Sequence, residues 1–158
     1  MAKIPRKYMA HFINAAESDD VSYIRLGDDL EEYNVEMSAQ VDNKQNILGE
    51  KAVVISGYEK SGDVATYYAD ADSILFARLQ SIIDQELTLD DLKTTVVEVK
   101  LWDQVQDNVY NAVCEEAFIE VVSYGGDTTG YQIPFKLHYT GAKRYGTFDL
   151  ATAVFTET

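Results

Sequence analysis

The sequence has few of the residues that usually build metal sites and nucleophilic sites. It contains one cysteine, Cys114, and two histidines, His11 and His138. A lone cysteine excludes a disulfide within the chain, which fits folding in a reducing compartment. Zinc sites use clustered cysteines and histidines, and these three residues lie far apart in the sequence. We therefore expect a half-buried structural thiol at Cys114, a surface histidine at His138, and neither a metal nor a cofactor.

Basic residues are also scarce. The chain has 13 Lys and Arg against 27 Asp and Glu, which gives a formal net charge of −14. Such a surface repels the phosphates of nucleic acids and of anionic membranes. The N-terminus is the exception, because residues 1–10 carry Lys3, Arg6 and Lys7 and no acid. This basic arm suits a contact with the acidic surface of another copy, and an untethered terminus explains it equally well.

Long hydrophobic runs are absent as well. No apolar run approaches the ~20 residues of a membrane-spanning helix, and the N-terminus lacks the apolar core of a signal peptide. We therefore expect a soluble protein that is made in the cytosol and has no membrane partner. The 158 residues show no linker and no internal repeat. This predicts a single domain over residues 1–158, with residues 1–20 as a possible N-terminal arm.

The clearest pattern that is present is a strict alternation over residues 33–42, YNVEMSAQVD. One side of it is apolar, and its members are Tyr33, Val35, Met37, Ala39 and Val41. The other side is polar, and its members are Asn34, Glu36, Ser38, Gln40 and Asp42. The alternation predicts a strand with one buried face and one polar face. Residues 43–51, NKQNILGEK, then predict a loop that is longer than a tight hairpin requires.

The rest of the chain predicts more strands and one helix. The strands are expected at residues 21–26, 52–58, 94–102, 112–124, 131–140 and 143–148, with turns at Gly62-Asp63, Gly125-Gly126-Asp127 and Gly141-Ala142. The helix is expected at residues 72–85, with Asp72 as N-cap and an apolar stripe of Ile74, Leu75, Leu79, Ile82 and Ile83. The predicted fold class is mainly β: a β-sandwich or barrel of about seven strands with one flanking α-helix.

Motifs of common enzyme and ion sites are incomplete. A P-loop needs a glycine before Lys60, and the chain has Glu59 there. The DADS stretch at 70–73 begins like a calcium loop, but it has Ile74 and Ser81 where ligands belong. Adjacent acids are interpreted as solvated surface: Asp19-Asp20, Asp28-Asp29, Glu31-Glu32, Asp90-Asp91 and Glu115-Glu116. We expect no enzyme, and a hydrolase that uses two of these acids is the enzymatic alternative.

Five segments, in order, resemble a known family. They are ISGYE, LFARLQSIID, TTVVEVKLW, SYGGDTTGYQIPFKLHYTG and RYGTFDLATAVF. Together they resemble the major tail tube protein of tailed bacteriophages, in the form common among phages of Gram-positive hosts. The resemblance spans residues 21–155, and residues 1–20 carry no matching motif. It implies a β-sandwich subunit with a flanking helix, six of which form a ring whose inner sheets close into one barrel.

The resemblance also implies partners. Rings of this chain would stack into a tube and contact other tail proteins, namely the terminator, the tape measure, the distal tail protein and, in a contractile tail, the sheath. DNA would pass through without specific binding, because an acidic lumen repels phosphate. The protein would be made in the host cytoplasm and reside in the virion. The alternative is a small β-sandwich binding module of the carbohydrate type, in which Trp102 and the eleven tyrosines form a sugar platform.

Two groups of residues are predicted to act in such a tube. The polar face of residues 33–42 would line the lumen, through Glu36, Ser38, Gln40 and Asp42, since the resemblance implies a long inner-barrel hairpin there. A solvated outer sheet has the same sequence pattern. The loop would bridge neighbouring subunits or rings, because Ile47 and Leu48 have no core to enter. Its candidate residues are Asn43, Lys44, Gln45, Asn46, Ile47 and Leu48.

Overall fold

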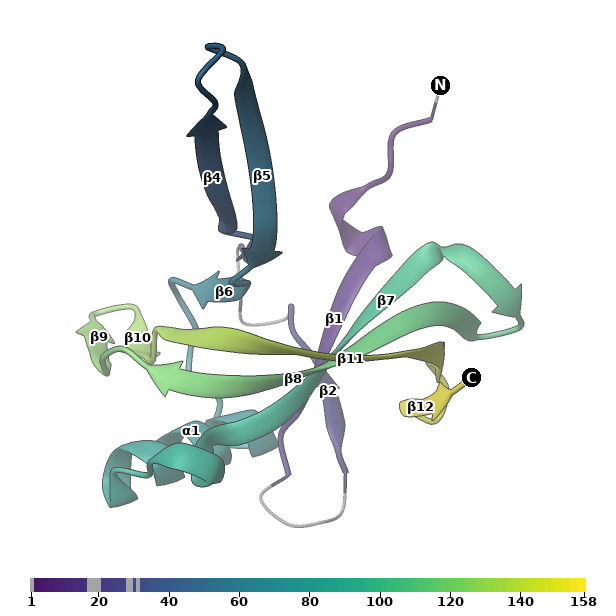
Figure 1. The fold of residues 1–158 in the computed structure, drawn as a ribbon. Helices are drawn as coiled ribbons and strands as arrows, with labels where there is room; N and C mark the ends of the chain where they lie inside the picture. The colour runs from purple at the N-terminus through teal and green to yellow at the C-terminus, as the bar shows by residue number, and fades with distance from the viewer. Residues whose placement is uncertain (1, 17–20, 28–29, 31) are drawn as a thin grey trace.

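The structure is a computed structural model that describes residues 2–16, 21–27, 30 and 32–158. It confirms the predicted class, since these residues are mainly β, with a large antiparallel sheet and one α-helix among them (Figure 1). The α-helix is α1 (Ile74–Gln85), and short 3-10 helices occupy Arg6–Tyr8 and Leu89–Leu92. The described strands are β1 (Met9–Asn14), β2 (Tyr23–Arg25), β3 (Asn34–Glu36), β4 (Ala39–Gln45), β5 (Lys51–Tyr58), β6 (Ser61–Val64), β7 (Lys93–Gln106), β8 (Val109–Val121), β9 (Gly125–Asp127), β10 (Gly130–Gln132), β11 (Phe135–Asp149) and β12 (Val154–Glu157).

Three long strands form the centre of the large sheet. β7, β8 and β11 lie side by side and antiparallel, with β1 and β2 added beyond β7, and β6 and β3 added beyond β11. β12 pairs with the second half of β11, from Gly146 opposite Glu157 to Asp149 opposite Val154. The strands at the two ends of this order, β2 and β3, have three residues each. Such short edge strands offer few free backbone groups for pairing with another chain.

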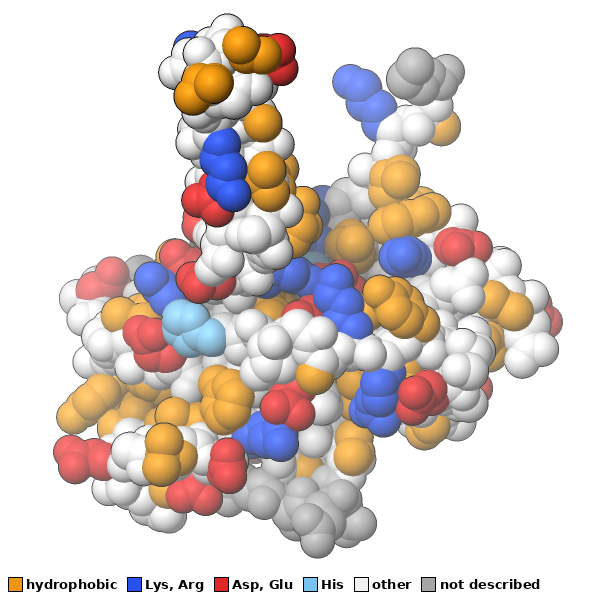
Figure 2. Space-filling model, in the orientation of Figure 1, with side chains coloured by type: hydrophobic (Ala, Val, Ile, Leu, Met, Phe, Trp, Pro, Cys, Tyr) orange, Lys and Arg blue, Asp and Glu red, His pale blue; other side chains and the backbone are white. Residues whose placement is uncertain are grey.

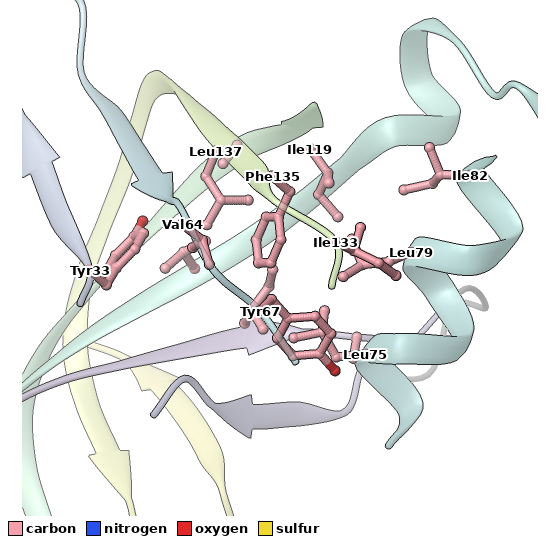
Figure 3. Close-up of a cluster of buried hydrophobic side chains, with 14 of the residues drawn as sticks. Tyr33, Val64, Tyr67, Leu75, Leu79, Ile82, Ile119, Ile133, Phe135 and Leu137 are labelled. Atoms are coloured by element: carbon pink, nitrogen blue, oxygen red, sulfur yellow. The ribbon is translucent and has the colours of Figure 1, made fainter. Parts of the chain in front are cut away.

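The large sheet buries apolar side chains on both of its faces. On β1, Phe12 belongs to one core cluster and Ile13 to the other, and the β7 neighbours Val97 and Val96 divide in the same way. Successive residues of a strand point to opposite faces, so each face is covered by its own cluster. Figure 3 shows the larger cluster, in which buried side chains of α1, β8 and β11 meet.

Helix α1 covers the larger cluster, as its periodicity predicts. It buries a stripe made of Leu75, Leu79 and Ile82, and Ile83 packs beside them partly buried. The predicted first member of the stripe, Ile74, is instead 50% exposed, because it is the first residue of the helix. The N-cap is Ser73 and not Asp72.

A buried arginine joins α1 to the sheet. Arg78 lies on the inner side of the helix and is 6% exposed. Its guanidinium donates hydrogen bonds to the backbone carbonyls of Asn14, Ala16 and Lys93, at 2.6 to 3.0 Å. These bonds satisfy the charged group inside the protein and tie the helix to the ends of β1 and β7.

Three predicted glycine turns have a different structure. Gly62-Asp63 lies inside β6, where both residues pair with β11. Gly141-Ala142 lies inside β11, at a shift in its register with β8 between Tyr139 and Lys143. Gly125-Gly126-Asp127 forms β9, which pairs with β10, so the turn of that small hairpin follows Asp127. Glycine marks bulges and close backbone approaches as well as turns, and sequence alone does not distinguish them.

The N-terminal arm is shorter than predicted. β1 lies within the large sheet between β2 and β7, and four of its six residues are buried. Of the predicted arm, residues 2–8 precede β1 and are exposed, and Figure 1 shows this segment extending away from the sheet. The prediction for residues 17–20 falls outside the described residues.

Candidate assembly site

A two-stranded hairpin projects from the body of the molecule. β4 and β5 pair with each other, from Ala39 opposite Tyr58 at the base to Gln45 opposite Lys51 near the tip. They form a sheet of their own, which stands away from the large sheet in Figure 1. Every residue of both strands is exposed except Gly57, which is intermediate. Both faces of this hairpin are therefore open to solvent in the single chain.

One face of the hairpin is apolar. The register places Val41 beside Ile55 and Ala39 beside Tyr58, and alternation puts Val53 on the same face. Val41, Val53, Ile55 and Tyr58 are 50%, 67%, 54% and 54% exposed. Figure 2 shows hydrophobic side chains along this hairpin and at its tip. These exposed apolar side chains make the hairpin the candidate interaction site.

The face predicted to be buried over residues 33–42 is buried only at its start. Tyr33 is 5% exposed, whereas Met37 is 52% and Val41 is 50% exposed. The predicted single strand is also wrong, because β3 ends at Glu36 and Ser38 has a left-handed φ of +44° before β4 begins at Ala39. Alternation indicates that one face of a strand is covered, but it does not say whether the same chain covers it.

The predicted loop at residues 43–51 is instead the outer half of the hairpin. Asn43, Lys44 and Gln45 belong to β4 and pair with β5. A turn follows, in which Oδ1 of Asn46 accepts hydrogen bonds from the backbone N–H groups of residues 48 and 50, at 2.9 and 3.0 Å. Gly49 closes it with a φ of +82°, in the left-handed region that favours glycine.

This turn holds two aliphatic side chains outward. Ile47 is 102% exposed and Leu48 is 76% exposed. The prediction that neither side chain has a core to enter is confirmed. The sequence therefore identified the exposed aliphatic residues and placed them in a loop, although that loop is shorter than the predicted residues 43–51.

The four candidate lumen residues are all exposed, but they do not share one strand. Glu36 lies in β3 opposite Ser61, and Ser38 lies between β3 and β4. Gln40 and Asp42 lie on the same face of the hairpin, opposite to that of Val41. That these residues line a lumen stays a prediction.

The start of the hairpin is anchored through Tyr33. Its hydroxyl forms a 2.6 Å hydrogen bond with the hydroxyl of Tyr139 on β11, and burial raises the pKa of both phenols. Arg6 donates to the carbonyl of Tyr33 at 2.9 Å. A Cβ at Gly62 would lie 2.0 Å from the Tyr33 hydroxyl oxygen, so the ring needs glycine at that position.

The end of the hairpin is anchored through Lys60. Its ammonium lies 2.7 Å from Oε1 of Glu115 and 5.1 Å from the ring centre of Tyr139. The other oxygen of Glu115 accepts a 3.1 Å hydrogen bond from the backbone N–H of Gly141. Because Glu115 is 3% exposed, its interpretation as a solvated acid is wrong. Sequence patterns did not reveal this pair, since its members lie far apart in the chain.

The remaining chemical candidates lie apart from the hairpin. His138 is on the surface as predicted, with its Nε2 2.7 Å from Glu120. Cys114 is 1% exposed and therefore more deeply buried than predicted. Within the described residues, no three His, Cys, Asp or Glu side chains gather closely enough to hold a metal ion. Of the predicted acid pairs, Asp19-Asp20, Asp28-Asp29 and the first member of Glu31-Glu32 fall outside those residues.

Two exposed aromatic rings lie on different parts of the molecule. Trp102 and Tyr124 are 44% and 63% exposed, but Trp102 lies in the outer part of β7 and Tyr124 follows the opposite end of β8. A sugar platform needs neighbouring exposed rings, and Trp102 and Tyr124 do not form such a pair. No helix in the described part of the chain is both long enough and apolar enough to span a membrane.

Comparisons with known proteins add no relative. No protein-family model matches the chain, and no curated protein matches it. The resemblance to tail tube proteins therefore stays a prediction from the sequence.

Proposed function

We propose that this chain is a structural subunit of a bacteriophage tail tube, in which hexameric rings stack into a hollow conduit for DNA. The observation that carries the proposal is the β4–β5 hairpin. It projects from the body and exposes Val41, Val53 and Ile55 on one face. A second copy of the same chain is the partner that is present wherever the protein is made, and it would cover this face.

The fold and the charge support the same proposal. A mainly β subunit with one helix is what the resemblance implies. In a ring, neighbouring hairpins would pair edge to edge into one barrel, which removes their free strand edges. The apolar face would then pack on the neighbouring subunit. The face with Gln40 and Asp42, which also carries Lys44 and Val54, would line the lumen, and we expect the acids of the chain to keep DNA from binding there.

The experiment is a test of assembly on the purified protein. We expect sedimentation velocity at rising concentration to show rings or polymers, and negative-stain microscopy to show tubes with a central channel. High salt should favour assembly, because it screens the repulsion between acidic subunits. A protein that stays monomeric at millimolar concentration, in both low and high salt, would contradict the proposal.

A further inference from the structure

An apolar pocket lies on the far side of the molecule from the hairpin. It is an open, shallow groove between the C-terminal half of α1 and the end of β8, with a volume of about 500 Å³. Its apolar lining comes from Ile82, Ile83, Leu87, Leu92, Ile119 and Val122. Figure 1 shows the hairpin and α1 extending from opposite sides of the large sheet, so the tip cannot reach the pocket of its own chain.

We propose that the hairpin tip of one copy inserts Ile47 and Leu48 into this α1–β8 pocket of the next copy. The proposal rests on the tail tube function and names the surface through which rings stack. Ile47 is fully exposed, at 102%, and the pocket offers the apolar surface that would remove it from water. Burying an aliphatic side chain of this size favours association.

Charge complementarity supports the same pairing. Residues 43–51 carry Lys44 and Lys51 against Glu50, so the outer hairpin is basic in a chain of net charge −14. The pocket is lined by two acids, Glu86 and Glu120. Lys44 and Lys51 are thus opposite in charge to Glu86, which favours this pairing, whereas Glu120 already lies 2.7 Å from Nε2 of His138.

The positions of the two surfaces determine the kind of assembly. Because the tip and the pocket lie on opposite sides of one molecule, copies that join through them form a head-to-tail contact. Each added copy leaves a free tip at one end of the stack and a free pocket at the other. Such contacts generate stacks of unlimited length. A two-fold symmetric contact would stop at a dimer.

Disulfide cross-linking tests the contact directly. A chain with both Ile47→Cys and Val122→Cys should give a ladder of reducible polymers under mild oxidation, because each copy links to the next. A mixture of the two single variants should give no more than one link between partners. The native Cys114 is 1% exposed and stays out of the reaction. Ile47→Cys with Val105→Cys is the matched control, since Val105 is 55% exposed on the outer part of β7, and it should give no ladder.

The outcomes separate this inference from the proposed function. Tubes in the microscope without a cross-link between positions 47 and 122 would overturn the tip-to-pocket contact and leave the tube function standing. Dimers of the single variant Ile47→Cys, linked tip to tip, would assign the tip to a symmetric contact and overturn it as well. A wild-type chain that stays monomeric at millimolar concentration would overturn both.

A second variant measures the strength of the contact. The Ile47→Asp variant should assemble only at a concentration about tenfold to a hundredfold higher than wild type needs. This change corresponds to the loss of one buried aliphatic side chain from the contact. Val105→Asp should leave that concentration unchanged. An equal effect of both substitutions would show that added charge, and not the tip, opposes assembly.

Discussion

The hydroxyl oxygens of Tyr33 and Tyr139 lie 2.6 Å apart and share a buried hydrogen bond. This bond connects the segment that leads into the β4–β5 hairpin with the central strand β11. Tyr33 is 5% and Tyr139 is 9% exposed. The segment that precedes the hairpin is therefore held by a polar contact inside the protein.

Removing one of these hydroxyls should destabilise the fold. Tyr33→Phe or Tyr139→Phe leaves the other hydroxyl buried without its partner, and we expect a loss of about 1–2 kcal/mol in the free energy of unfolding. The double variant should cost less than the sum of the two single variants, because no unpaired hydroxyl remains. Urea unfolding measures all three, with Tyr145→Phe as control on a 62% exposed ring. Strictly additive losses would show that the two hydroxyls do not act as a pair.

The same tyrosines should make the protein sensitive to alkali. Burial raises the pKa of Tyr33 and Tyr139 above the ordinary 10.0, and it raises the pKa of Tyr23 to about 12. Below pH 10.0 these phenols are neutral in both the folded and the unfolded state. Above pH 10.0 the phenols of the unfolded chain lose protons that the folded protein keeps. Stability should therefore fall as the pH rises above 10.0. In urea unfolding over this range, Tyr139→Phe should show a shallower fall than wild type, and an unchanged slope would contradict the assignment.

Glu98 should act in the opposite direction, at acid pH. A hydrogen bond from His11, with 3.4 Å between Nε2 and Oε1, lowers the pKa of Glu98 below its ordinary 4.5. The ionised carboxylate thus stabilises the fold at pH above 4.5, and this contribution is lost as the pH falls through the lowered pKa. The difference in unfolding free energy between wild type and Glu98→Gln should be largest near neutral pH and should shrink in acid. A difference that grows in acid would show that the pKa is raised.

The apolar face of the hairpin should matter for assembly and not for the fold of the single chain. Val53 and Ile55 are already exposed, so Val53→Thr with Ile55→Thr should change the unfolding free energy of the monomer by less than about 0.5 kcal/mol. The same variant should fail to form rings in sedimentation velocity. Val105→Thr, on an exposed valine outside the hairpin, should assemble normally. Normal assembly of the hairpin variant would rule this face out as the subunit contact.

The proposed lumen face should tolerate a change of charge in assembly but not in DNA passage. Glu36→Lys with Asp42→Lys should still form tubes, which then retain DNA at low salt and release it at high salt. Asp103→Lys with Asp107→Lys makes the same change of charge in the outer β7–β8 segment and should retain none. In a phage, the lumen variant should slow genome ejection. Ejection at the wild-type rate would place Glu36 and Asp42 outside the lumen.

Local periodicity predicted the helix, whose burial is one-sided. The helix stripe of Leu75, Leu79 and Ile82 was found because a helix packed on a sheet repeats its apolar residues at the period of its turns. β1 was missed for the opposite reason. Its residues Ala10, Phe12 and Ile13 are all buried, on two faces that belong to different clusters. A strand covered on both faces has no alternation to detect, and β1, with six residues, also lacks the long β-branched run that indicates β7.

The candidate site divides in the same way. Ile47 and Leu48 could be identified from sequence, because aliphatic side chains among polar ones have no core within reach along the chain. The contacts that hold the hairpin in place could not be predicted. Lys60 forms an ion pair with Glu115, and Tyr33 forms a hydrogen bond with Tyr139. The members of each pair lie so far apart in the sequence that no local pattern predicts the contact.

The sequence by itself determined the mainly β class, the single helix, and a strongly acidic surface. Each of these follows from the composition or from the periodicity of the sequence. Both are local properties that do not depend on contacts between distant residues. The tertiary structure alone decided that the alternating stretch from Tyr33 to Val41 passes from a buried core to an exposed hairpin. That outcome depends on where the large sheet ends and β4 leaves it, and so on contacts between segments far apart in the chain.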